Sequence, residues 1–177
     1  MNNKYELLLN ITEQSMESLL RTLDKAETHV KETGVLESEL LTAKLYPDMM
    51  DFTKQIQISS DYGRKNLAYL AGKEPVKMED NETTISELKE RVKKSLEVVN
   101  TFKVSDFEKA DEAKVSLGWM NGAYFHGKDF LDQFAITNLL FHVVTAYDIL
   151  RSKGVNLGKA DFIGEIKMQP APSTSNA

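Results

Sequence analysis

The segment Phe130–Arg151 constrains the fold of this chain more than any other. It spans about six helical turns, contains no glycine or proline, and carries Phe, Leu, Ile or Val on every side of the helical wheel. An ordinary surface helix has a single apolar stripe. The segment is therefore predicted to be a central helix that is either wrapped by other helices or buried at a subunit interface.

Three polar side chains of this segment point the same way. Asn138 and His142 are four residues apart and Thr145 is three further on, so they share one face of a helix. A histidine among aromatic residues in a buried helix needs a hydrogen-bond partner. Asn138, a tyrosine or a backbone group is the expected partner of His142.

The composition bounds the fold and the chemistry. A length of 177 residues suits one compact domain, and we predict a single helical domain over residues 1–167 followed by a disordered tail, residues 168–177, which is rich in proline and small polar residues. The chain has no cysteine, which excludes disulfides, thiolate metal sites and a cysteine nucleophile. The net charge is -5, with both signs interleaved. No basic stripe is visible, so a nucleic-acid partner is not expected.

Neither secretion nor a membrane span is expected. The first residues lack the basic start, apolar run and small-residue cleavage site of a secretory signal. Polar residues interrupt the apolar segment at Asp132, Gln133, Asn138, His142 and Asp148, which is too often for a lipid-facing helix. A cytoplasmic location and no membrane partner are the corresponding predictions.

Apolar residues at helical spacing predict further helices. The expected ranges are residues 4–30, ended by Gly34; a short helix over 37–44; residues 47–71, starting at Pro47; and residues 85–102. Thr84 and Glu87 have the form of a capping box for the last of these. Around Arg91, acids alternate with bases, and the Glu87–Arg91 spacing predicts an ion pair on a solvated helix face.

Two further patterns complete the expected architecture. In the 47–71 helix, Asp51, Gln55 and Tyr62 form a second polar strip that would lie near the bundle axis. Asn121-Gly122 is a strong signal for a two-residue hairpin turn. With that turn, Trp119 would face Tyr124 and Leu117 would face His126. The fold class predicted is an all-α, up-and-down four-helix bundle with a small β-hairpin before the last long helix.

The last long helix and its exit also resemble a known family. The similarity rests on residues spread from 47 to 162: Pro47-Asp48-Met49, Gln55, Gly72, Pro75, Glu82-Thr83-Thr84, Asn138, Phe141-His142, Ala146-Tyr147, Leu150-Arg151, Gly154-Val155, Leu157-Gly158-Lys159 and Asp161-Phe162. Over roughly residues 5–164 the chain resembles an uncharacterised bacterial domain family in the DinB-like (YfiT-like) superfamily of four-helix bundles. The resemblance implies a compact, commonly dimeric bundle.

Better-known members of that superfamily hold a divalent metal with three histidines, one on the second long helix and two in a His-x-x-x-His pair on the last. In this sequence His142 matches the first position of that pair, but four residues later stands Ala146. The start of the second long helix offers Asp48 and Asp51 and no histidine. A three-histidine metal site is therefore not predicted.

The function predicted is binding or scaffolding of a small molecule or partner by a homodimer, without a metal cofactor. The candidate pocket consists of Asp51, Gln55, Tyr62, Asn138, His142, Thr145 and Tyr147. The alternative is a metal-dependent hydrolase or thiol transferase in which His142, Asp51 and Gln55 hold zinc or nickel as a Lewis acid. The sequence leaves open whether the protein is an enzyme.

Overall fold

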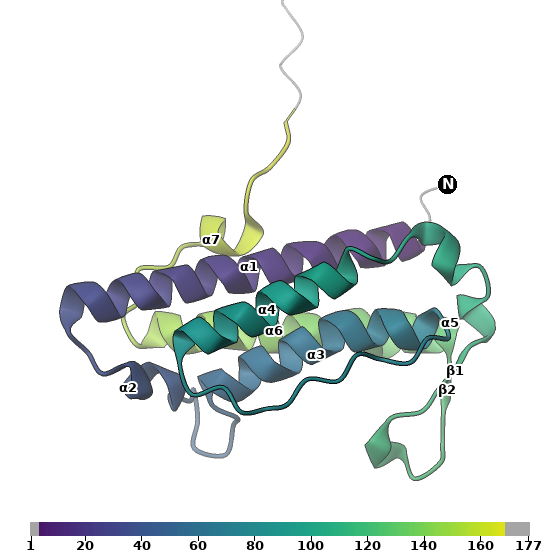
Figure 1. The fold of residues 1–177 in the computed structure, drawn as a ribbon, viewed down its shortest axis with the longest axis horizontal. Coiled ribbons are helices and arrows are strands. Elements are labelled where there is room, and N and C mark those ends of the chain that lie inside the picture. Colours follow the sequence, from purple (N-terminus) through teal and green to yellow (C-terminus); the bar gives the residue numbers. More distant parts are fainter. Residues whose placement is uncertain (1–3, 169–177) are drawn as a thin grey trace, which may run out of the picture.

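A computed structural model describes residues 4–168 (Figure 1). Its elements in chain order are α1 (Lys4–Thr33), α2 (Glu37–Leu41), α3 (Phe52–Leu70), α4 (Ile85–Val99), η1 (Val104–Phe107), η2 (Ala110–Glu112), β1 (Lys114–Val115), η3 (Gly118–Met120), β2 (Phe125–His126), α5 (Gly127–Phe130), η4 (Leu131–Ala135), α6 (Ile136–Ser152) and α7 (Lys159–Ile163). Of the predicted tail, residues 168–177, only residue 168 lies within the described residues.

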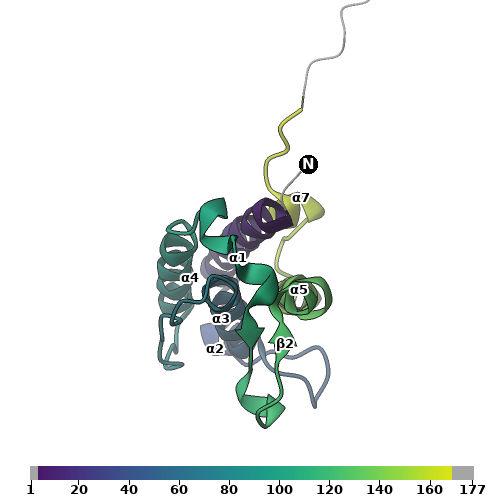
Figure 2. The same cartoon turned by 90° about the vertical axis from the view of Figure 1, so that its right-hand side faces the viewer.

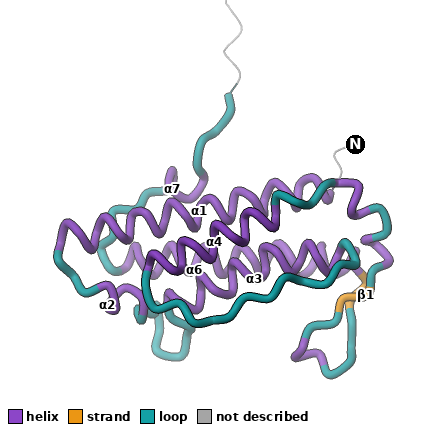
Figure 3. Tube along the Cα trace, viewed as in Figure 1, coloured by secondary structure: helices purple, strands orange, loops and turns teal. Residues whose placement is uncertain are grey.

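The long helices α1, α3, α4 and α6 form a bundle. Both α4 and α6 pack against α1 and α3, and they lie on opposite sides of that pair (Figure 2). The predicted all-α bundle with a β-hairpin before the last long helix is confirmed. The connector of residues 71–84 returns along the bundle, so α3 and α4 run in the same direction (Figures 1 and 3).

The most apolar helix is not the one enclosed on all sides. Helices α5, η4 and α6 form one continuous helix, Gly127–Ser152, which packs on α1 and α3, whereas Phe141 and Val144 on its outer side are 56% and 41% exposed. Of the two predicted environments, enclosure by other helices is therefore wrong. It is α3 that is enclosed, because it packs against α1, α4 and α6 and lies between α4 and α6 (Figure 2), although much of its buried surface is polar.

By length and composition alone, Gly127–Ser152 would also be able to cross a membrane. The core helix of a bundle meets the same criterion, and this helix packs its inner side on α1 and α3. The absence of a membrane partner stays a prediction.

The ends of α3 and α4 are set by side-chain caps. Helix α3 begins at Phe52 because the Asp51 carboxylate accepts a hydrogen bond from the Lys54 amide at 2.9 Å. The predicted start at Pro47 is thus wrong by one to two turns. The capping box of α4 is confirmed, since the Glu87 amide donates to Thr84 Oγ1 at 3.1 Å and the Glu87 carboxylate accepts from the Thr84 amide at 3.1 Å.

The hairpin turn lies where it was predicted, but the register of the two strands differs from the predicted one. Asn121 and Gly122 have φ angles of 49° and 88°, and the Ala123 amide donates to the Met120 carbonyl at 3.0 Å. The strands pair Lys114 with His126, so Leu117 does not face His126. The 3-10 turn η3 takes residues 118–120 out of the first strand, and this shifts the register by three positions.

Gly127 provides a test of how the hairpin docks on the bundle. A Cβ at this position would lie 1.8 Å from the Ala110 carbonyl oxygen, which belongs to the backbone and cannot move aside cheaply. Gly127→Ala should lower the free energy of unfolding by about 2–3 kcal/mol, as measured by urea denaturation. Gly118→Ala is the control, because nothing lies within 4 Å of its Cβ. Equal stability of the two variants would contradict this packing.

Candidate functional site

His142 of α6 is held by Gln55 of α3. His142 Nδ1 and Gln55 Oε1 are 2.7 Å apart, and Gln55 Nε2 donates to the Met50 carbonyl at 3.3 Å. Because that amide nitrogen is turned toward Met50, Oε1 is the atom that faces the imidazole, and an oxygen can only accept. Nδ1 must therefore carry the proton, and Nε2 keeps its lone pair. A partner was predicted for His142, but the predicted identity, Asn138, tyrosine or backbone, was wrong.

The surroundings of His142 keep the ring neutral. Burial lowers the pKa of His142 below its usual 6.5, since desolvation disfavours the imidazolium. Tyr62 of α3 stacks on the ring with centroids 5.8 Å apart, and Phe141 meets its edge at 5.2 Å. Within residues 4–168, Nε2 makes no hydrogen bond, so it is the ring atom available to a ligand.

A π-helical turn, η4, shapes the wall beside His142. Asn66 of α3, which is buried, donates to the Ala135 carbonyl at the end of this turn at 3.1 Å. The extra residue of a π turn changes the direction of neighbouring side chains. Phe134 within it lies 5.8 Å from Tyr62 and 6.1 Å from Trp119, measured between ring centroids. Through Phe134, the π turn thus contacts both Trp119 of the hairpin loop and Tyr62 beside His142.

His142, Tyr62 and Trp119 border a cleft of about 390 Å³ between α3, the connector, the hairpin loop and α6. It is lined by Met50, Lys54, Gln57, Ile58, Asp61, Tyr62, Lys65, Tyr69, Asp80, Leu117, Gly118, Trp119 and His142. Its charged groups are paired: Lys54 with Asp80 at 2.5 Å, and Lys65 with Asp61. The cleft is aromatic on one side and close to electrically neutral on the other.

The structure brings together some of the predicted site residues and separates others. Gln55, Tyr62 and His142 meet as described. Asp51 caps α3 instead of entering the cleft. The Asn138 amide nitrogen, one turn from His142, is buried without a partner in the described chain. Two residues point elsewhere: Thr145 donates to the Phe141 carbonyl of its own helix at 2.7 Å, and Tyr147 packs against Phe162 near α7.

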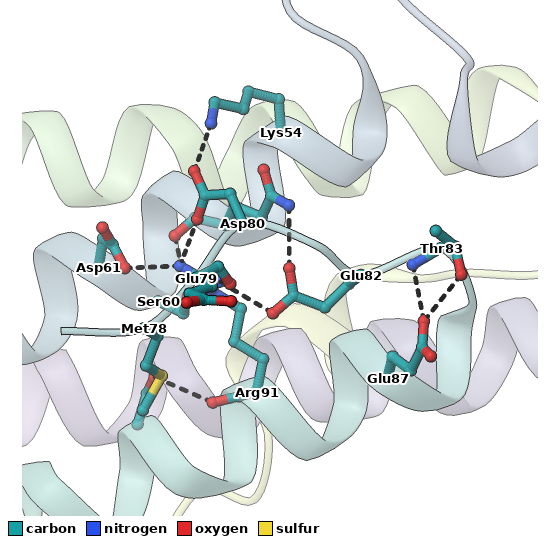
Figure 4. Close-up of polar contacts among 12 residues, drawn as sticks. Lys54, Ser60, Asp61, Met78, Glu79, Asp80, Glu82, Thr83, Glu87 and Arg91 are labelled. Carbon is teal, nitrogen blue, oxygen red and sulfur yellow. Dashed lines mark hydrogen bonds and ion pairs between the residues drawn. The ribbon is translucent and has the colours of Figure 1, made fainter.

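A buried ion cluster next to the cleft was not predicted from the sequence (Figure 4). The side chain of Arg91 is 2% exposed and contacts Asp61 at 2.7 Å, Asp80 at 2.9 Å and Glu82 at 2.9 Å. It also donates to Ser60 Oγ at 2.7 Å and to the Glu79 carbonyl at 2.9 Å. The cluster therefore fastens the connector, which carries Asp80 and Glu82, to α3 and α4.

Arg64 extends this cluster along α3. Its side chain is fully buried, pairs with Asp61 at 2.5 Å, and donates to the Ser60 and Val76 carbonyls at 2.9 and 3.0 Å. The predicted Glu87–Arg91 pair is wrong, because Glu87 is used in the cap. The signal was present: Arg91 follows Leu88 by three residues and so shares the buried face of α4.

The residues present do not fit a three-histidine metal site. Position 146, where the second histidine of the pair would stand, is Ala146, which is fully buried. The other histidines lie on α1, at His29, and on the hairpin, at His126. Within residues 4–168, no group of three or more His, Asp and Glu side chains is placed to hold a metal ion.

These features define an all-α bundle with a histidine-containing aromatic cleft. Residues 5–163 match the family described as Domain of unknown function (DUF1993), and the chain belongs to this family. The crystal structure of a DinB family member protein from Shewanella denitrificans is similar, with 32% sequence identity, a TM-score of 0.85, and coverage of 96% of this chain and 100% of that one. None of the curated proteins matches the chain significantly.

Removal of Arg91 tests the ion cluster. Arg91→Gln would leave Asp61, Asp80 and Glu82 without their shared cation, and we expect a loss of about 3–5 kcal/mol in unfolding free energy by urea denaturation. Lys93→Gln is the matched control, since among residues 4–168 Lys93 pairs only with exposed Glu90, and should cost less than about 1 kcal/mol. Comparable losses in both variants would contradict the role given to Arg91.

The same ion cluster predicts that the free energy of unfolding decreases at acid pH. Desolvation raises the pKa of Asp61, but the hydrogen bond from Lys65 and the charge of Arg64 outweigh it, so the net pKa is below the usual 3.8. A depressed folded-state pKa stabilises the fold above pH 3.8 and loses this contribution as the pH falls through the folded value. Unfolding free energy measured from neutral to acid pH should fall less steeply in Asp61→Asn than in the wild type; parallel curves would refute the assignment.

Proposed function

We propose that this protein binds a small, flat, uncharged molecule in the cleft, with His142 Nε2 accepting a hydrogen bond from it. The observation that carries the proposal is the 2.7 Å contact between Gln55 and His142 Nδ1. It fixes the ring in the tautomer whose other nitrogen is an acceptor, and burial keeps that nitrogen unprotonated. Gln55 is thus a positioning residue, and His142 is the recognition residue.

The dimensions and lining of the cleft support this class of ligand. Pockets for small molecules usually have volumes of 300–1,000 Å³ and combine aromatic walls with a few placed polar groups, and this cleft measures about 390 Å³. Tyr62 and Trp119 offer ring faces or edges for a planar molecule. Because Lys54 pairs with Asp80 and Lys65 with Asp61, neither sign of charge is left to attract an ion.

Trp119 makes the proposal directly testable, because it is the chain's sole tryptophan. Its indole N–H gives one side-chain signal in a ¹⁵N–¹H NMR spectrum. Benzimidazole, a flat molecule with one N–H donor, should shift this signal saturably, whereas 1-methylbenzimidazole, which lacks the donor, should bind about tenfold more weakly. The same loss of affinity for benzimidazole is expected in His142→Phe.

His29→Phe is the matched control, because it makes the same replacement on α1, away from the cleft, and should bind as the wild type does. The absence of a saturable shift, or equal affinity for the two probes, would contradict the proposal. Stoichiometric zinc or nickel in protein purified without chelator, lost in His142→Phe, would instead support the metal-dependent hydrolase or thiol transferase.

A further inference from the structure

A second hollow, of about 390 Å³, adjoins the cleft. The two spaces share Lys65 and Tyr69 of α3 as lining residues. The connector, which runs along α3 in Figure 1, forms the remaining wall of the second hollow with Glu74, Pro75, Lys77 and Met78. A molecule held in front of His142 therefore has room to extend along α3 into this hollow.

The connector wall is held in place by the two buried arginines. Arg64 of α3 donates to the Val76 carbonyl at 3.0 Å, and Arg91 of α4 donates to the Glu79 carbonyl at 2.9 Å. Both bonds use main-chain oxygens, and they flank Lys77 along the chain. The arginines thus fix the path of the connector without using the side chains that line the hollow.

The polar groups of the second hollow are free to bind a ligand. Within residues 4–168, the Tyr69 hydroxyl makes no hydrogen bond, and neither Glu74 nor Lys77 forms an ion pair. Burial raises the pKa of Tyr69, and the nearby carboxylates of Glu74 and Asp61 raise it further. Tyr69 therefore keeps its proton at neutral pH. The hollow offers a phenol donor close to a carboxylate acceptor.

Uncharged hydroxyl groups complement this arrangement. An alcohol both donates and accepts a hydrogen bond, so it can donate to the Glu74 carboxylate while it accepts from the Tyr69 phenol. The unpaired charges of Glu74 and Lys77 cancel, which favours a neutral group over an anion. In dinucleotide-binding folds, a carboxylate binds a ribose hydroxyl in the same way. A sugar is therefore suited to the second hollow.

We propose that the ligand is a nucleoside, with its base in the cleft and its ribose in the second hollow. This inference rests on the function proposed above and extends it: the base is the flat part that donates an N–H group to His142 Nε2, and the ribose hydroxyls bind Glu74 and Tyr69. Tyr62, which stacks on His142, and Tyr69 are about 10 Å apart along α3. A base with its attached sugar spans this distance.

Adenine and adenosine test the proposal, with the indole signal of Trp119 as the readout. Adenosine should bind about tenfold more tightly than adenine, because its ribose adds the contacts in the second hollow. Glu74→Ala should remove this gain and leave the affinity for adenine unchanged. Glu79→Ala is the matched control, because Glu79 is an exposed acid of the same connector that lines neither space. This variant should bind adenosine as the wild type does.

The possible results separate this inference from the function on which it rests. Adenosine that binds no more tightly than adenine, or equal losses in Glu74→Ala and Glu79→Ala, would overturn the nucleoside proposal alone. Tighter binding of adenosine monophosphate than of adenosine would also overturn it, since the second hollow would then be a phosphate site. If neither benzimidazole nor adenine shifts the Trp119 signal, the proposed function fails and the nucleoside proposal fails with it.

Discussion

The cation of Arg91, buried among the carboxylates of Asp61, Asp80 and Glu82, is the constraint on which the rest of the structure depends. Burying a charge without partners costs several kcal/mol, so Arg91, whose side chain is 2% exposed, requires these carboxylates. Arg91 comes from α4, Asp61 from α3, and the two remaining acids from the connector. The cluster therefore determines where the connector crosses the bundle, and allows α3 to bury polar groups such as Ser60 at its centre.

The position of the connector then determines the cleft. Asp80 reaches back to Lys54 and neutralises it, and both residues line the hollow in front of His142. From the other side, the π turn directs Phe134 toward Tyr62 and Trp119. Between these walls, the amide of Gln55 settles the tautomer of the imidazole. The ion cluster around Arg91 thus determines the shape of the cleft, and the hydrogen bond between Gln55 and His142 determines which imidazole nitrogen can accept a hydrogen bond there.

The sequence predicts those features that depend on neighbouring residues. The bundle follows from helical periodicity, the start of α4 from the Thr84 capping box, and the hairpin turn from Asn121-Gly122, because each is decided within a few residues. The likeness to a DinB-like family also proves correct. Features decided by tertiary contact were missed, since periodicity records how apolar a face is and not what covers it.

Residues of α3 and of the candidate site show which features the sequence alone does not predict. Helix α3 looks half polar and was not recognised as the enclosed helix, because several of its polar groups find partners only in the folded bundle: Ser60 in Arg91, and Gln57 and Arg64 in the connector. In the candidate site, Gln55, Tyr62 and His142 were placed on facing helices, and they do meet. The pairing of Gln55 with His142 could not be read from the sequence, because it depends on the relative height of α3 and α6 in the bundle. The π turn, which carries Phe134, likewise leaves no signature in composition.

The protonation state of the His142 imidazole can be measured directly. Nitrogen-15 NMR of the histidine-labelled protein at neutral pH reports separately on Nδ1 and Nε2 of each imidazole. For His142 we predict a neutral ring with its proton on Nδ1, and loss of this fixed tautomer in Gln55→Leu, which removes the accepting oxygen. A proton on Nε2 in the wild type, or an imidazolium at neutral pH, would contradict the account, because the cleft would then offer a donor where an acceptor is required.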